Sequence, residues 1–240
     1  SDLSFDFSGR IALVVGGSSG IGSGVVDGLV LSGARVIYAS RSRGKNNKEA
    51  IYIKTDVTDE DSILNLFKEV DGHGPIDFLV NAVGISSNTR LSDLTSSEWD
   101  LVMSANLRSL FLCCKEAIAR MKTNSFGKIV NISSIAGRHK SLVAGVHYVS
   151  SKAGIIGLSK QLASELSNTG INVNVVAPSQ TLTPLLESAM SQEELGLLSE
   201  NIPVRRIAEV SEQVGPILFL LSDASSYING AVIDVNGGQI

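Results

Sequence analysis

Residues 11–29 read IALVVGGSSGIGSGVVDGL: an apolar run, a glycine-rich turn and the start of a helical pattern. The run Ile11–Val15 is apolar and partly β-branched, which is typical of a buried strand. Beyond the turn, Ile21, Val25 and Leu29 recur at positions i, i+4 and i+8, which places them on one face of a helix. A strand that passes through glycines directly into a helix is half of a parallel β-α-β unit.

The same alternation continues along the chain. Apolar runs predict seven strands, at residues 11–15, 36–39, 51–54, 78–81, 129–132, 173–177 and 232–235. Helical patterns lie between them, and the longest cover residues 103–121, 148–166 and 212–221. We therefore predict the α/β class, with a single Rossmann-like doubly wound domain over residues 1–240 and a seven-stranded parallel sheet flanked by helices. Residues 41–50 are too few for a crossover helix, so a polar loop must make that connection.

Composition excludes several classes of protein. Hydrophobic residues make up 43% and charged residues 18% of 240, which is typical of a folded domain. A net charge of −4 offers no basic surface, so no nucleic-acid partner is expected. The apolar runs are too short to span a membrane, residues 1–4 do not resemble a signal peptide, and Cys113 and Cys114 are adjacent and poorly placed to pair. We expect a cytoplasmic protein without disulfides.

The turn after the first strand is suited to a phosphate group. Glycines allow a tight turn and a close approach of the backbone, and a helix N-terminus presents unpaired N–H groups and a positive dipole end. The expected contacts are Gly16, Ser18, Ser19, Gly20, Ile21 and Gly22. The alternative is a merely flexible turn, since the chain has 23 glycines, but the position between first strand and first helix favours a nucleotide site.

Tyr148 and Lys152 are four positions apart, so a helix places them on the same face. An ordinary tyrosine has a pKa of about 10, and a neighbouring ammonium is expected to lower the pKa of Tyr148 towards neutrality. Ser134 follows the fifth predicted strand, where an open sheet presents groups to its ligand crevice. An accidental pairing is the alternative for each residue alone, but their order after the glycine turn favours a site for proton transfer.

Together these motifs resemble the short-chain dehydrogenase/reductase family over nearly the whole chain. Residues 15–22 resemble its T-G-x-x-x-G-x-G turn, with Val15 in place of threonine, and residues 81–84 resemble its N-N-A-G, with Ala82 in place of the second asparagine. Residues 178–183 resemble P-G-x-x-x-T, with Ser179 in place of glycine. The family also places an asparagine at Asn106.

The resemblance implies a role for each matching residue. Tyr148 would exchange a proton with the substrate oxygen, Lys152 would lower the tyrosine pKa and bind the nicotinamide ribose, Ser134 would orient the carbonyl, and Asn106 would support the proton relay through a water. The further cofactor contacts that the resemblance implies are Asp56, Val57, Asn81, Ala82, Gly84, Pro178, Thr181 and Thr183. Small-molecule ketones and secondary alcohols are the implied substrates, and the pattern is most similar to 3-oxoacyl-carrier-protein reductases.

The second strand indicates which nicotinamide cofactor binds. NAD-preferring members of the family often carry an aspartate at its end, whereas this chain has Ser40 and Arg41. An arginine can pair with the 2′-phosphate that an aspartate would repel. NADP(H) is therefore favoured over NAD(H), with a solvated loop arginine as the alternative.

Other features bear on rival functions. The histidines and cysteines have no metal-ligand spacing, so no metal site is expected. Members of the family that reduce enoyl thioesters typically have a longer interval between tyrosine and lysine, so the resemblance disfavours that reaction for Tyr148 and Lys152. Sugar epimerases among the relatives usually have a larger C-terminal substrate region than 240 residues provide. A catalytically silent NADP-binding scaffold or sensor remains the alternative. Residues 184–201 are predicted to form a lid whose apolar side chains face the substrate, namely Leu185, Leu186, Met190, Leu195, Leu197 and Leu198.

Small and apolar residues on the two long helices predict a homotetramer or homodimer.

Overall fold

The computed structural model describes residues 5–45, 48–141 and 143–240. Its strands are β1 (Ile11–Val15), β2 (Arg35–Ser40), β3 (Ile51–Lys54), β4 (Phe78–Asn81), β5 (Gly127–Ile132), β6 (Ile171–Pro178) and β7 (Val232–Val235). Its helices are α1 (Gly20–Leu31), α2 (Glu60–Asp71), α3 (Ser96–Met103), α4 (Ser109–Asn124), α5 (Ile135–Arg138), α6 (Val146–Glu165), α7 (Pro184–Ala189), α8 (Gln192–Glu200) and α9 (Val210–Leu221). A π-helical turn, Ser104–Arg108, joins α3 to α4, and a 3-10 turn, Asp223–Ser225, follows α9.

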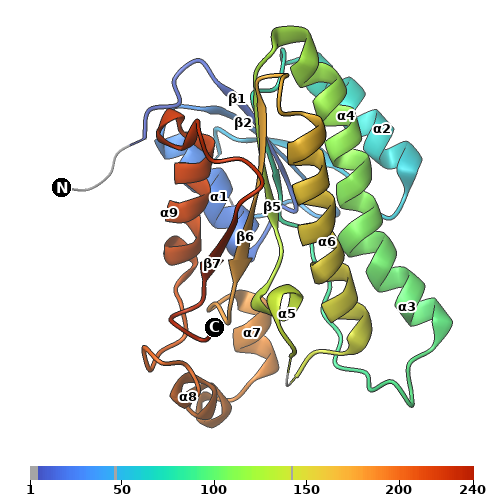
Figure 1. Cartoon of the computed structure of the whole chain (residues 1–240), viewed down its shortest axis with the longest axis vertical. Helices are drawn as coiled ribbons and strands as arrows, with labels where there is room; N and C mark the ends of the chain where they lie inside the picture. The colour runs from blue at the N-terminus through green and yellow to red at the C-terminus, as the bar shows by residue number, and fades with distance from the viewer. Residues whose placement is uncertain (1–4, 46–47, 142) are drawn as a thin grey trace.

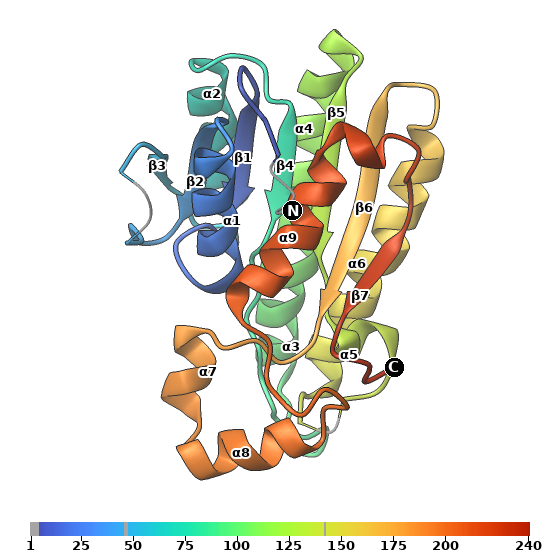
Figure 2. The same cartoon turned by 90° about the vertical axis from the view of Figure 1, so that its left-hand side faces the viewer.

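All seven strands form one parallel sheet in the order β3-β2-β1-β4-β5-β6-β7. Figure 2 shows them side by side, with β3 at one edge and β7 at the other. The direction of winding reverses between β1 and β4, and ligands of open α/β sheets bind outside the carboxyl ends of the strands at that point. The predicted fold class is confirmed.

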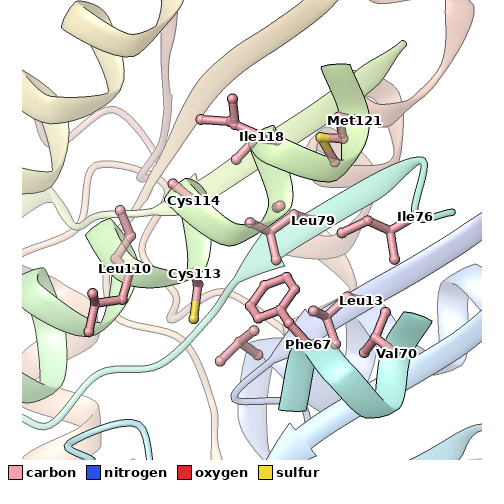
Figure 3. Packing of buried hydrophobic residues seen from close by; sticks show 14 of the residues in the cluster. Leu13, Phe67, Val70, Ile76, Leu79, Leu110, Cys113, Cys114, Ile118 and Met121 are labelled. Carbon is pink, nitrogen blue, oxygen red and sulfur yellow. The ribbon is translucent and has the colours of Figure 1, made fainter. Parts of the chain in front are cut away.

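Helices cover both faces of the sheet (Figure 1). On one face, α2, α4 and α6 cover the sheet. Phe67 of α2 packs there in one buried cluster with Leu13 of β1 and Leu79 of β4 (Figure 3). Cys113 and Cys114 are fully buried in this same layer, and burial raises the pKa of the Cys114 thiol to about 12. Their place in the core agrees with the expectation that they form no disulfide framework. On the other face, α1 and α9 cover the sheet.

The connection between β2 and β3 contains no helix among its described residues, 41–45 and 48–50. Asn46 and Asn47 of the predicted polar loop lie outside the described part of the chain. A hydrogen bond from the Tyr52 hydroxyl to the Ser40 carbonyl oxygen, 3.2 Å long, ties β3 to the end of β2.

The π-helical turn interrupts the long helical pattern of residues 103–121, which predicts one broad apolar stripe. Beyond the turn, most residues of that stripe are buried on α4, namely Leu110, Cys114, Ala117, Ile118 and Met121. Phe111, which the same stripe placed in the core, is 45% exposed, and Leu112 is buried instead. No helix in the described ranges is both long enough and apolar enough to cross a membrane.

Candidate active site

A cleft of about 630 Å³ opens at the carboxyl ends of the central strands, beside α5 and α7. Residues more than 150 positions apart in the sequence line this cleft together, because parallel strands have all their carboxyl ends at one edge of the sheet. The predicted residues that line it are Ser19, Gly20, Ile21, Gly22, Ala82, Gly84, Ser134, Tyr148, Lys152, Pro178, Thr181 and Thr183. The predicted residues that do not line it are Gly16, Ser18, Ser40, Arg41, Asp56, Val57, Asn81 and Asn106.

The glycine turn has backbone geometry that only glycine adopts easily. Gly16 has a φ of 87°, and a Cβ placed there would lie 2.7 Å from the Val83 nitrogen. A Cβ on Gly22 would overlap the Gly16 carbonyl oxygen. Ser19 begins α1 without a capping hydrogen bond from its side chain, so the first amides of the helix are open to an external acceptor. The turn therefore fits a pyrophosphate at the N-terminus of α1.

Ser134, Tyr148 and Lys152 come from two elements, the start of α5 and the helix α6. Ser134 caps α5 just beyond β5 and accepts a 3.1 Å hydrogen bond from the Ala136 nitrogen. Tyr148 lies in the first turn of α6, and Lys152 lies one turn further on, as the spacing predicts. The Lys152 Nζ is 5.8 Å from the centre of the Tyr148 ring and donates a 3.0 Å hydrogen bond to the Ile132 carbonyl oxygen.

Burial, rather than charge, dominates the acid–base properties of this cluster. It raises the pKa of the Tyr148 phenol above 10, although a hydrogen bond with Ser134 acts in the opposite direction. The expectation of a lowered tyrosine pKa is thus wrong for the protein alone, because burial removes hydration from the phenolate and this effect exceeds that of the Ser134 hydrogen bond. Lys152 is 3% exposed, and burial lowers the pKa of its ammonium from 10.5 to about 8. At neutral pH the site contains a neutral phenol and a charged lysine.

Asn106 lies in the π-helical turn and is 1% exposed. Its Oδ1 accepts from the Ile85 nitrogen (2.8 Å), and its Nδ2 donates to the Ile85 carbonyl oxygen (3.0 Å) and to Ser151 Oγ (3.0 Å). Both amide hydrogens are therefore used within the protein. Asn106 holds the chain after β4 against α6, and its side chain is not part of the cleft wall.

Two serines that sequence reasoning missed hold helix α6 in place. Ser133 Oγ donates a 2.8 Å hydrogen bond to the Lys152 carbonyl oxygen, and Ser151 Oγ donates one of the same length to the Tyr148 carbonyl oxygen. Ser133 precedes a predicted site residue and Ser151 is three positions after one, but serine is too common for that spacing to be a signal.

The residues predicted to meet the adenosine lie at the ends of β2 and β3. The Ser40 hydroxyl donates a 2.7 Å hydrogen bond to the Ser42 carbonyl oxygen, so its hydrogen is already used within the loop. Arg41 is exposed, and its charge contributes to a lowered pKa of the Asp56 carboxyl, which is caused mainly by hydrogen bonds from Thr58. Val57 packs against the core below α2.

Asn81 lies in a buried polar network instead of the cleft. Its Nδ2 donates to Asn131 Oδ1 at 2.8 Å, and the Asn131 amide donates to Ser159 Oγ at 2.9 Å. The network links β4, β5 and α6. Ala82 and Gly84, which follow Asn81 in the sequence, do line the cleft, and a Cβ on Gly84 would lie 3.2 Å from the Lys152 Nζ.

The predicted lid corresponds to α7 and α8, which lie together beside the carboxyl edge of the sheet (Figures 1 and 2). Thr183 caps α7 by accepting a 3.3 Å hydrogen bond from the Leu186 nitrogen. Of the six apolar residues predicted to face a substrate, Leu186 lines the cleft, and the side chain of Leu185 lies outside the described part of the structure.

The other four lid residues correct that prediction. Leu195 is buried in a separate small cluster with Ile202 and Ile207, and Met190 and Leu198 pack against it, whereas Leu197 is 57% exposed. Sequence periodicity cannot distinguish a substrate-facing side chain from one that packs within its own segment.

Within the described ranges, no group of three or more histidine, cysteine, aspartate or glutamate side chains could hold a metal ion.

Comparison with known proteins identifies similar sequences and structures over nearly the whole chain. A family model described as enoyl-(acyl carrier protein) reductase matches residues 15–239. The 3-oxoacyl-[acyl-carrier-protein] reductase of Haemophilus influenzae is 35% identical over 238 residues, which cover 96% of this chain and 98% of that protein. Among solved structures, one named ribose-5-phosphate isomerase from Brucella melitensis has a TM-score of 0.93 at 33% identity, covering 99% of this chain and 95% of that one. A protein of Beutenbergia cavernae, provisionally named an NAD(P)-dependent gluconate 5-dehydrogenase and solved with bound NADP, has a TM-score of 0.91 at 29% identity and covers 99% of both chains.

Proposed function

Because the chain belongs to the short-chain dehydrogenase/reductase family, we propose that it is an NADP(H)-dependent enzyme that interconverts a ketone and a secondary alcohol. The observation that carries this proposal is the cluster of Ser134, Tyr148 and Lys152 in one cleft with the glycine turn. A nicotinamide would supply or accept the hydride. The protein would bind and orient the substrate and would exchange the proton with it.

In the direction of reduction, Tyr148 is the general acid. Its raised pKa keeps the phenol protonated at neutral pH, so a proton is available as negative charge develops on the substrate oxygen. Ser134 donates a second hydrogen bond to that oxygen and so fixes the carbonyl in place. Lys152 provides a positive charge beside the phenol, which stabilises the phenolate that remains.

NADP(H) is the proposed cofactor. The turn from Gly16 to Gly22 would hold the pyrophosphate, and Arg41 would bind the 2′-phosphate. Support comes from the exposure of Arg41 and from the absence of an acidic residue at Ser40, the last residue of that strand. The neighbouring carboxylate of Asp56 bonds to Thr58, which turns it towards its own loop.

A 3-oxoacyl thioester is the first substrate class to test, since the sequence relatives bear that name. The matching family model is described as an enoyl reductase, but the proton donor and lysine lie one helical turn apart, which favours carbonyl chemistry. A single catalytic domain over residues 1–240, a cytoplasmic location and a homotetramer or homodimer complete the proposal. Phe111, exposed on α4, is the residue that best supports self-association.

The test is NADPH oxidation measured with a panel of ketones and 3-oxoacyl thioesters, for the wild type and for Tyr148→Phe. We expect turnover of at least one compound by the wild type and a loss of at least about hundredfold in Tyr148→Phe, with NADPH affinity unchanged. A residual rate above about a tenth of the wild type would assign the proton to another group. Tight NADPH binding without turnover of any compound would instead favour the silent scaffold or sensor.

A further inference from the structure

A carboxylate of α3 fastens one wall of the cleft. Ser86, Ser87 and Asn88 form this wall, in the loop between β4 and α3. The Oε1 atom of Glu98 accepts hydrogen bonds from the Ser87 hydroxyl at 2.5 Å and from the Thr89 hydroxyl at 2.7 Å. These bonds hold the pKa of Glu98 below its usual value, so the group is a carboxylate at neutral pH. Hydrogen bonds to a charged acceptor are stronger than neutral ones, so the wall is held firmly.

The same carboxylate oxygen faces the catalytic helix. His147, in the first turn of α6 next to Tyr148, is completely buried, and its Nε2 lies 3.5 Å from Glu98 Oε1. Within residues 5–45, 48–141 and 143–240, neither ring nitrogen makes a hydrogen bond. A polar ring buried in this way is costly for the fold, and the carboxylate is the acceptor placed to compensate. The proton-transfer mechanism proposed above does not use this pair.

Main-chain packing leaves little space between the wall and the helix. The Gly145 nitrogen donates a 2.8 Å hydrogen bond to the Ser87 carbonyl oxygen. A Cβ on Gly145 would lie 2.5 Å from His147 Cε1 and 2.6 Å from the Thr89 carbonyl oxygen. A shift of the wall therefore displaces the start of α6, which includes Tyr148.

We propose that Glu98 and His147 are positioning residues that set the cleft wall at residues 86–88 relative to the Tyr148 phenol. Glu98 acts through Ser87 and Thr89, and His147 acts through the first turn of α6. The pair determines where a bound ketone lies relative to its proton donor. This role in substrate placement rests on the proposed function, whereas the mechanical link between wall and helix does not.

The first test of the link needs no substrate. Amide hydrogen exchange of residues 86–89 and 145–149 is compared in the wild type, Glu98→Ala, Glu98→Gln and Asp100→Ala. Asp100 is an exposed acidic residue of the same helix and serves as the matched control. We expect exchange to rise at least about tenfold in both segments of Glu98→Ala, because two charge-assisted bonds are lost. Glu98→Gln should recover most of the protection, since its amide oxygen can accept both hydroxyls, and Asp100→Ala should match the wild type.

The second test uses whichever substrate the enzyme turns over. Glu98→Ala should raise KM for the ketone about tenfold or more, with a smaller change in kcat and an unchanged NADPH dissociation constant. His147→Phe, which preserves ring volume but removes both nitrogens, should shift KM in the same direction, whereas the exposed His139→Asn should not.

The outcomes separate the two proposals. If no compound is turned over but exchange in both segments rises as described, the proposed function fails and the link between wall and helix holds. If Glu98→Ala remains folded by circular dichroism and neither segment changes, the link is refuted. It is also refuted if Asp100→Ala behaves like Glu98→Ala, or if NADPH affinity falls together with substrate affinity. If Glu98→Ala does not fold, the same criteria apply to His147→Phe.

Discussion

We expect the buried charge of Lys152 to lower the stability of the folded protein. Lys152 is 3% exposed, and within the described part of the chain its ammonium makes one hydrogen bond, to the Ile132 carbonyl oxygen, so much of its hydration is lost without full replacement. Replacement by Met keeps a long unbranched side chain and removes the charge. We therefore expect Lys152→Met to be inactive and more stable than the wild type at neutral pH.

The size of the effect follows from the lysine pKa. Burial moves it from 10.5 to about 8, which at about 1.4 kcal/mol per pKa unit corresponds to roughly 3 kcal/mol. Lys152→Met also removes the hydrogen bond to the Ile132 carbonyl oxygen, which lowers stability by about 1 kcal/mol. The net increase in the free energy of unfolding at pH 7 is therefore about 2 kcal/mol. For a chain of this size, that corresponds to a rise in Tm of about 4–8 °C.

The sign of the pH dependence is fixed by the direction of the shift. Between the folded pKa of about 8 and the unfolded value of 10.5, the unfolded chain binds more protons than the folded one, so wild-type stability rises with pH. The destabilisation caused by burying the Lys152 ammonium is fully present below about pH 8 and is lost by about pH 10.5. The advantage of Lys152→Met should therefore be largest at pH 7 and fall steadily towards pH 10.

The assay is thermal unfolding of the protein without cofactor at pH 7, 8, 9 and 10. Lys160→Met, an exposed lysine on the same helix, is the control and should leave Tm nearly unchanged. A lower Tm for Lys152→Met at pH 7, or an advantage that does not decrease with pH, would refute the reasoning from burial.

Three further predictions concern the cofactor and the assembly. Arg41→Ala should weaken the affinity for NADPH about ten- to hundredfold and leave the affinity for NADH nearly unchanged, and Ser40→Asp should shift the preference towards NADH. If the wild type binds both cofactors equally and Arg41→Ala changes neither affinity, the arginine is only a solvated loop charge. Gly22→Ala should reduce NADPH binding at least tenfold in a fluorescence titration, because its Cβ would displace the Gly16 carbonyl oxygen, and normal binding would exclude the turn as the pyrophosphate site. Phe111→Asp should convert a wild-type dimer or tetramer to a monomer in light scattering, and a wild-type mass near 25.3 kDa at micromolar concentration would contradict self-association.

Much of the candidate site could be predicted because its chemistry depends on local spacing. A four-residue interval fixes Tyr148 and Lys152 on one helix face, and glycines mark the turn before α1. Roles that depend on surroundings could not be predicted in this way. The pKa of Tyr148 is raised instead of lowered because the phenol is buried, and burial depends on residues far away in the sequence.

The sequence by itself determined the order of strands and helices, the parallel sheet and the place of the glycine turn, since these follow from hydrophobic period and backbone freedom. Only the tertiary structure decided which side chains share the cleft. Phe111 is exposed on α4, and the π-helical turn places Asn106 against Ile85 and Ser151. Leu195 of the predicted lid packs with Ile202 and Ile207 instead of facing the cleft. Glu98 contacts both the cleft wall and His147. Periodicity specifies which face of an element is apolar, but the partner of that face is set by packing between segments that no local pattern connects.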